Sequence, residues 1–313
     1  MLGRTVRKRD GRRWAASALG LALLALVIGY VLRHWDEVVS GLDPHPAWLI
    51  AGLSGELVLV TLRAVMLREA CRPFDVDVGR REAVGLLSWA TLANHVATAF
   101  GGMGLRAAYL ARRHRLDLAG FVSLTSALYA VQFLLLALAG LAATARVDAA
   151  AILWLRVAFA TLAALCVALL AVPFPVPRGQ GAVAGVVRRV VEGWRLLSGR
   201  PLVRLVPLQL LYVAAGAATV WAYFSFAGWG FSPGEALLVS TLSELSVLVP
   251  LTPAGLGILE SAVGLGATLV GAPLAIGLTV AGVRRLVGLL VVALLAALFA
   301  PGTTLPSDRA SRS

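Results

Sequence analysis

Charged side chains are scarce in this chain of 313 residues, in which Asp, Glu, Lys and Arg together make up only 14%. A soluble domain of ordinary composition carries about 25% of such residues. Hydrophobic residues make up 59%, and the mean hydropathy is +0.85. A soluble chain of this kind would lack the polar surface to cover its exterior, and a disordered chain or a disulfide scaffold is equally excluded. The composition predicts an all-α polytopic membrane protein.

Lysine, cysteine and catalytic motifs are also nearly absent. Of the 28 basic residues only Lys8 is a lysine, and Cys71 and Cys166 lack the CxxC spacing of metal or redox sites. No GxSxG, HExxH or Walker motif occurs, and no GxGxxG loop opens a βαβ unit. We therefore expect neither an enzyme nor a bound cofactor or metal.

Six apolar segments are long enough to cross a bilayer, which takes about 20 residues. They are Trp14–Leu32, Pro46–Leu67, Leu118–Ala143, Ala151–Val172, Val206–Ala227 and Pro273–Phe299. Little of the chain is left for a soluble domain. We therefore expect a single membrane domain over residues 1–313.

Two further apolar segments are interrupted. Ala83–Leu105 is broken at Gly102 and Gly104. Gly234–Gly271 is broken at Pro250, Pro253, Gly255 and Gly257. Irregular backbone is tolerated at membrane depth only where protein or a water-filled cavity surrounds it. The breaks predict two re-entrant helix pairs beside about six spans, with an inverted repeat around a central cavity as one interpretation. Eight full spans are the alternative.

The distribution of basic residues indicates the orientation, since cytoplasmic loops are enriched in Lys and Arg. If the N-terminus is cytoplasmic and both pairs are re-entrant, 22 of the 28 basic residues fall on the cytoplasmic side. The loops on the other side hold only Arg33 and Arg146. We therefore expect both termini (residues 1–13 and 301–313) in the cytoplasm. This topology accounts for the net charge of +12 without a nucleic-acid partner.

Residues 173–204 form the longest polar stretch inside the chain. Within them, Ala182–Arg204 places Val and Trp at helical spacing, with arginines on the other face. This pattern predicts an amphipathic helix on the cytoplasmic leaflet, or a linker helix packed on the bundle.

Arg284 and Arg285 are the most unusual charged residues, because they lie near the middle of an apolar segment. An ionisable group at this depth costs a few kcal/mol unless it is paired or hydrated. One of the arginines could bind a lipid phosphate or a carboxylate. Alternatively, they form internal ion pairs with Glu260 or Glu244, or lie in a short cytoplasmic loop.

The two breaks carry further polar candidates. Glu260 should lie in the first turn of a helix that starts at about Gly257, where a carboxylate suits the helix dipole. Arg106 should start the helix after Gly104, either near the mouth of a cavity or as an ordinary cytoplasmic anchor. Asn94 and His95 flank the same break, where His95 could transfer protons or simply hydrogen-bond to the fold.

Two stretches around these breaks carry a family resemblance. The first has an Asn before a glycine-rich turn, then an Arg and an aromatic-Leu pair; its residues are Asn94, Gly102, Gly104, Arg106 and Tyr109-Leu110. The second follows P-x-x-P-x-G-x-G-x-x-E with a late Arg-Leu; its residues are Pro250, Pro253, Gly255, Gly257, Glu260 and Arg285-Leu286. Together they resemble the lysylphosphatidylglycerol synthase transmembrane region family. The first motif departs from a common version, since Leu105 stands where an acidic residue precedes the Arg.

The resemblance implies a flippase-like module in a bacterial inner membrane that moves a lipid between leaflets. It does not imply lysyl transfer, because the soluble synthase domain is missing from this sequence. The ligand expected is a membrane lipid, in particular an anionic phospholipid, bound by Asn94, Arg106, Glu260, Arg284 and Arg285. Two other functions are considered: an intramembrane enzyme acting on a lipid or polyprenyl-linked sugar, and a non-catalytic partner of a glycosyltransferase or envelope complex.

Overall fold

The computed structural model describes residues 46–96, 101–145, 152–171, 181–197, 199–249, 252 and 255–299, together with residues 29, 33 and 36. Within these ranges the chain is helical and contains no strand. Among the described helices, five are long and apolar enough to cross a membrane. They are α3 (Pro46–Cys71), α6 (Leu118–Thr144), α7 (Leu153–Ala171), α9 (Arg200–Phe226) and α12 (Leu274–Leu298). Five of the predicted spans are thus found as helices. Apart from residue 29, Trp14–Leu32 lies outside the described residues, as do residues 1–13 and 301–313.

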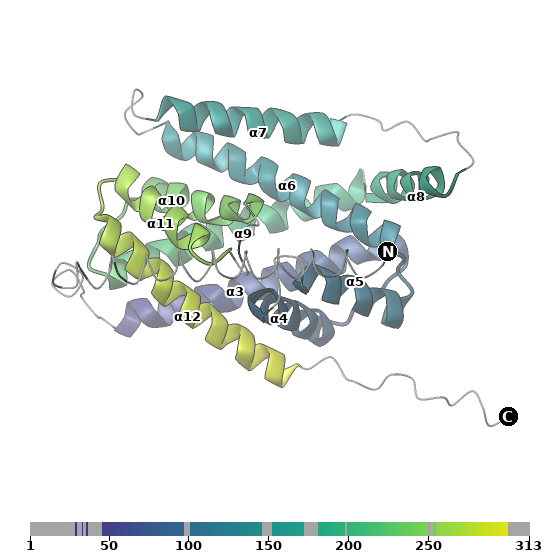
Figure 1. Cartoon of the computed structure of the whole chain (residues 1–313), viewed down its shortest axis with the longest axis horizontal. Coiled ribbons are helices and arrows are strands. Elements are labelled where there is room, and N and C mark those ends of the chain that lie inside the picture. The colour runs from purple at the N-terminus through teal and green to yellow at the C-terminus, as the bar shows by residue number, and fades with distance from the viewer. Residues whose placement is uncertain are drawn as a thin grey trace, which may run out of the picture.

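Both interrupted segments form pairs of shorter helices. The first pair is α4 (Arg80–Val96) with α5 (Gly101–His114), and the second is α10 (Pro233–Leu245) with α11 (Ile258–Leu269). At 1.5 Å per residue these helices are about 18–26 Å long, against about 30 Å for the hydrocarbon core of a bilayer. In Figure 1 the two pairs occupy opposite halves of the bundle along its long axis.

The glycines of the first pair do not interrupt a helix, contrary to the prediction. Gly102 and Gly104 both lie in the first turn of α5, so the interruption precedes Gly101, and Arg106 is the sixth residue of the helix rather than its start. Gly102 instead allows close packing, because a Cβ there would lie 2.1 Å from the backbone oxygen of Ala90 on α4. In this glycine-rich segment, Gly102 therefore serves a close contact between α4 and α5 rather than the break itself.

The second break follows the prediction more closely. Two glycines have positive φ just before α11, Gly255 at 64° and Gly257 at 79°, a region that residues with a Cβ rarely adopt. Pro250 and Pro253 lie outside the described residues. On the other side of the break, α10 ends in the 3₁₀ turn η2 (Ser246–Leu248).

Helices α3 and α9 pack closely against each other in the interior of the bundle. A Cβ on Gly52 would lie 2.7 Å from the ring of Tyr223, and one on Gly55 would lie 2.2 Å from Thr219 Oγ1. Small residues let helix backbones approach closely in membranes, where packing replaces the hydrophobic effect as the driving force. This contact brings polar residues of α3 next to α9 in the interior.

Helix α8 (Ala182–Leu197) packs on the bundle. Gly193 lies against Ser123 of α6, whose hydroxyl donates to the Val190 backbone oxygen at 2.8 Å. The arginines of α8, Arg188, Arg189 and Arg195, are exposed. The predicted amphipathic helix is therefore present and packs on α6, while its position at a leaflet stays a prediction. It ends at Leu197 rather than Arg204, because the spanning helix α9 already begins at Arg200.

Candidate functional site

A chain of alternating charges crosses the interior between α3, α10 and α12. Arg284 Nε donates to Glu56 Oε1 at 2.9 Å, and Arg284 Nη2 lies 3.5 Å from Glu244 Oε1. The other oxygen of Glu244, Oε2, lies 3.2 Å from Nη2 of Arg63. The four residues therefore form an unbroken ionic chain from Glu56 to Arg63, with no net charge.

Neutral side chains complete this ionic chain. The Tyr212 hydroxyl of α9 contacts Arg63 and donates to Glu244 Oε2 at 2.8 Å, while the Arg63 guanidinium lies 5.0 Å from the Tyr212 ring centroid. Arg284 Nη1 donates to Ser243 Oγ at 3.2 Å. Buried charges are tolerated when they are paired and their remaining polar atoms are hydrogen-bonded. Four helices are therefore joined by these contacts near the middle of the bundle.

A second ion pair fixes the break before α11. Arg285 Nε lies 2.5 Å from Glu260 Oε1, and the Glu260 side chain is only 3% exposed. Glu260 Oε2 accepts from the Gly257 amide at 2.8 Å, and Arg285 Nη2 donates to the Gly255 carbonyl at 3.4 Å. As predicted, Glu260 thus lies in the first turn of its helix and caps it. The pair attaches α12 to the irregular backbone of the break.

The alternatives for the two central arginines can now be separated. Both form internal ion pairs, Arg285 with Glu260 and Arg284 with Glu56 and Glu244. The cytoplasmic-loop alternative is wrong, because α12 is continuous through both residues. Adjacent residues of a helix point about 100° apart, which explains why each arginine contacts a different acidic partner. The partner Glu56 was not expected.

At the first break, Asn94 has a structural contact. Its Oδ1 accepts from the Gly102 amide at 2.7 Å and so caps α5 across the interruption. His95 Nδ1 contacts the Thr91 carbonyl at 2.9 Å, and the imidazole lies close enough to Arg285 and Glu260 to interact with both electrostatically. The end of α4 is therefore close to the ion pair of the second break.

Arg106 differs from the other arginines of this region. Its Nε is buried and has no hydrogen-bond partner, and the guanidinium forms no ion pair with any described residue. Counting the charges near the two breaks gives four arginines and three glutamates: Arg63, Arg106, Arg284 and Arg285, with Glu56, Glu244 and Glu260. The described residues therefore leave one positive charge uncompensated, and it lies about 8 Å along α5 from the first break.

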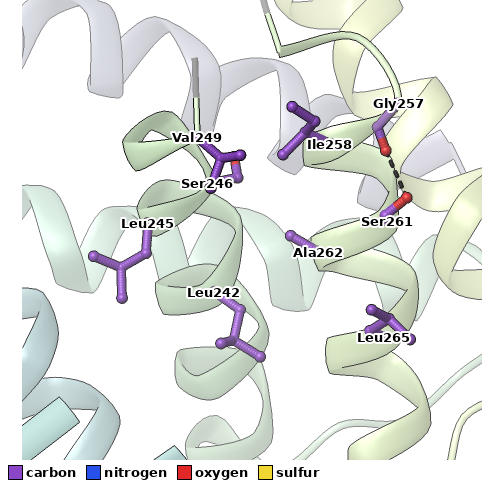
Figure 2. A pocket seen from close by; sticks show the side chains of 9 residues that line it. All are labelled: Leu242, Leu245, Ser246, Val249, Gly257, Ile258, Ser261, Ala262 and Leu265. Carbon is purple, nitrogen blue, oxygen red and sulfur yellow. Dashed lines mark hydrogen bonds between the residues drawn. The ribbon is translucent and has the colours of Figure 1, made fainter. Parts of the chain in front are cut away.

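An apolar groove separates α10 from α11 (Figure 2). It has a volume of about 390 Å³. It is lined by Leu242, Leu245, Ser246, Val249, Gly257, Ile258, Ser261, Ala262 and Leu265. Both serine hydroxyls donate to backbone carbonyls, Ser246 to Ser243 and Ser261 to Gly257. The groove thus offers almost only apolar surface, and it is not the polar cavity that the sequence predicts.

The sequence as a whole matches a known protein family. Residues 17–296 match the family described as Lysylphosphatidylglycerol synthase TM region. The chain belongs to this family. No curated protein and no solved structure matches it. Membership in the lysylphosphatidylglycerol synthase TM family, which has a role in lipid modification and flipping, identifies a multi-pass membrane protein.

In this member of the lysylphosphatidylglycerol synthase TM family, residues of both sequence motifs interact with each other at the breaks. Asn94 accepts a hydrogen bond from Gly102, and Glu260 accepts one from Gly257 and forms an ion pair with Arg285. Tyr212 and Ser243, which complete the ionic chain, gave no signal in the sequence, because neutral polar residues are common in apolar helices. Among the described residues no three His, Cys, Asp or Glu side chains gather in a way that could hold a metal ion.

A separate cluster closes the base of the α4–α5 pair. Glu82 accepts hydrogen bonds from Tyr109 at 2.7 Å and the Gly79 amide at 3.1 Å, and its Oε1 lies 2.8 Å from His114 Nε2. Burial alone would raise the pKa of Glu82, but these hydrogen bonds together hold the pKa below its ordinary value of 4.5. The ionised carboxylate therefore stabilises the fold.

This cluster predicts a pH-dependent difference between the wild type and Glu82→Gln. Since the folded pKa is lowered, the stabilisation is complete above the ordinary carboxyl pKa of 4.5 and is lost as the pH falls through the folded value. Thermal unfolding in detergent between pH 3 and pH 6 measures it. The wild type should melt higher at the upper end, and the two melting temperatures should converge in acid. A gap that widens in acid would contradict the assignment.

Proposed function

We propose that this protein moves a phospholipid between the leaflets of a bacterial cytoplasmic membrane, without chemical change to the lipid. The uncompensated Arg106 beside the first break carries the proposal. A cation inside a bundle of apolar helices requires an anion or water, and a lipid phosphate supplies that anion. Because Arg binds phosphate through two parallel hydrogen bonds, its geometry favours a phospholipid.

The proposed arrangement has both termini in the cytoplasm and the two short helix pairs entering from opposite faces. In this arrangement, the C-terminal ends of α4 and α10 lie near each other at mid-membrane depth, beside Arg284 and Arg285. The headgroup must lose part of its hydration there, and the polar groups at the breaks replace the lost water contacts. Glu260, Arg284 and Arg285 supply charge at mid-membrane depth, and Asn94 holds α5 in place at the start of the path.

Transport in proteoliposomes tests this function. Phosphatidylglycerol with a fluorescent acyl chain would be incorporated, and a membrane-impermeant reductant would report how fast inner-leaflet lipid becomes accessible. We expect rapid movement with the wild type, about tenfold slower movement for Arg106→Gln, because a charge-assisted contact is lost, and no transport for Glu260→Ala or Arg285→Ala.

The matched control is Arg156→Gln. Arg156 is an arginine of the spanning helix α7 that donates to the Thr144 carbonyl of α6. It should move lipid at the wild-type rate. Wild-type rates in Glu260→Ala and Arg285→Ala together would refute the site, and a folded wild type that moves no phospholipid would refute the function.

A further inference from the structure

Arg63 is much more accessible than the two other arginines that form ion pairs inside the bundle, Arg284 and Arg285. The Arg63 side chain is 47% exposed, whereas those of Arg284 and Arg285 are both 12% exposed. Arg63 is nevertheless well inside a spanning helix, since it lies about 7 Å from the middle of α3 at 1.5 Å per residue. An exposed charge at this depth needs an explanation other than ordinary surface location.

The Arg63 side chain does not extend toward the membrane surface. Long basic side chains near helix ends usually extend to the interface. Here the guanidinium is held toward the interior by Glu244 of α10 and Tyr212 of α9, and it lies over the Tyr212 ring. Because a cation facing hydrocarbon is costly, its accessible side requires water or an anion.

The order of charges makes Arg63 the open positive end of the chain. Glu244 is shared by Arg63 and Arg284, while Arg284 also has Glu56 to itself. The single carboxylate near Arg63 is therefore divided between two arginines, which leaves the positive charge of Arg63 only partly neutralised. The negative end, Glu56, is 13% exposed and contacts Arg284.

The free donors of Arg63 suit an anion. Its hydrogen bonds to described residues all use Nη2, so Nε and Nη1 donate to none of them. A guanidinium presents its donors in a planar fork that matches two oxygens of a phosphate. One edge of Arg63 is thus fixed by the protein, and the remaining donors are available to a ligand.

We propose that Arg63 binds the phosphodiester of the lipid that this protein handles, and that Tyr212 and Glu244 are positioning residues for it. The assignment rests on the proposed function and adds to it a recognition site for phosphate on α3. It also predicts selectivity: lipids with a phosphodiester are favoured over glycolipids of similar size that lack one. Arg284 and Arg285 are held by carboxylates and are only 12% exposed, so they are less accessible to the headgroup than Arg63.

Lipid retention by the purified full-length chain tests the assignment separately from transport. Native mass spectrometry would compare phosphatidylglycerol with monoglucosyl diacylglycerol on the wild type, Arg63→Gln and Arg63→Lys. We expect Arg63→Gln to retain phosphatidylglycerol about tenfold less than the wild type, as for the loss of one charge-assisted contact. The glucosyl lipid should bind equally to both proteins. Arg63→Lys should be intermediate, because it keeps the charge and loses the fork.

Two controls separate binding from folding. Arg156→Gln removes another intramembrane arginine and should retain lipid like the wild type. In Arg63→Gln/Glu244→Gln the carboxylate left by the first change is neutralised, and phosphatidylglycerol retention should stay low. Recovery of retention in this double variant would show a structural role and overturn the proposal, as would equal loss of both lipids in Arg63→Gln.

The outcomes distinguish the two proposals. A wild type that retains phosphatidylglycerol through Arg63 but moves no lipid in proteoliposomes refutes translocation and leaves the Arg63 site standing. A wild type that moves lipid, with Arg63→Gln retaining phosphatidylglycerol normally, refutes the Arg63 site and leaves translocation standing.

Discussion

Replacement of Glu260 by alanine is expected to lower the free energy of unfolding by about 3–5 kcal/mol, the usual cost of removing one partner of a buried ion pair. Two contacts are lost together. Arg285 is left without its carboxylate at mid-membrane depth, and the Gly257 amide loses the acceptor that caps α11. Thermal or denaturant unfolding in detergent measures the loss.

Two variants show which contact is responsible. Glu260→Gln keeps an oxygen for the Gly257 amide and loses the charge, so it should be more stable than Glu260→Ala. In Glu260→Gln/Arg285→Gln both charges are gone, and the stability should recover toward the wild type, since a buried pair contributes little beyond the cost of desolvating it. If Glu260→Ala were as stable as the wild type, the buried pair would not exist as described.

Gly102→Ala is expected to destabilise the protein by about 1–3 kcal/mol, the range for overpacking an interior. The added Cβ would lie 2.1 Å from the Ala90 carbonyl and 2.7 Å from Asn94 Oδ1. It would therefore push α5 away from α4 and disturb the hydrogen bond by which Asn94 caps α5. Transport should fall with stability, because Arg106 lies one turn further along α5.

Gly104→Ala is the matched control for this change. Gly104 is in the same turn of α5, but a Cβ there meets nothing within 4 Å. Alanine in a helix is more stable than glycine by up to about 1 kcal/mol, so Gly104→Ala should be neutral or stabilising. Effects of the same sign at both positions would contradict the close α4–α5 contact.

The spans were predictable from the sequence because each depends on local composition. The five described spanning helices agree closely with the apolar segments, and α3 begins at the predicted Pro46. The first turn of α11 was also predictable, since the glycines before Glu260 supply the backbone conformation and Glu260 supplies the cap.

The partners of the arginines were only partly predictable. Glu260 and Glu244 were expected near Arg284 and Arg285, but Glu56 pairs with Arg284 across 228 residues of sequence. Such a contact depends on how α3 and α12 pack, which no local pattern encodes. The position of the first break was predicted wrongly for a related reason. Glycines are found both in loops and at close contacts between helices, and only the packing of α4 on α5 distinguishes the two.

The ionic chain also constrains how this sequence can vary during evolution. Glu56, Arg63, Glu244 and Arg284 belong to three helices, and their charges sum to zero. Loss of any one leaves an unpaired charge in the interior, whereas loss of a neighbouring pair together can be nearly neutral. The stability of the fold should therefore favour homologues that change these positions in oppositely charged pairs, so that an acid lost on α3 or α10 is accompanied by a base lost on a different helix.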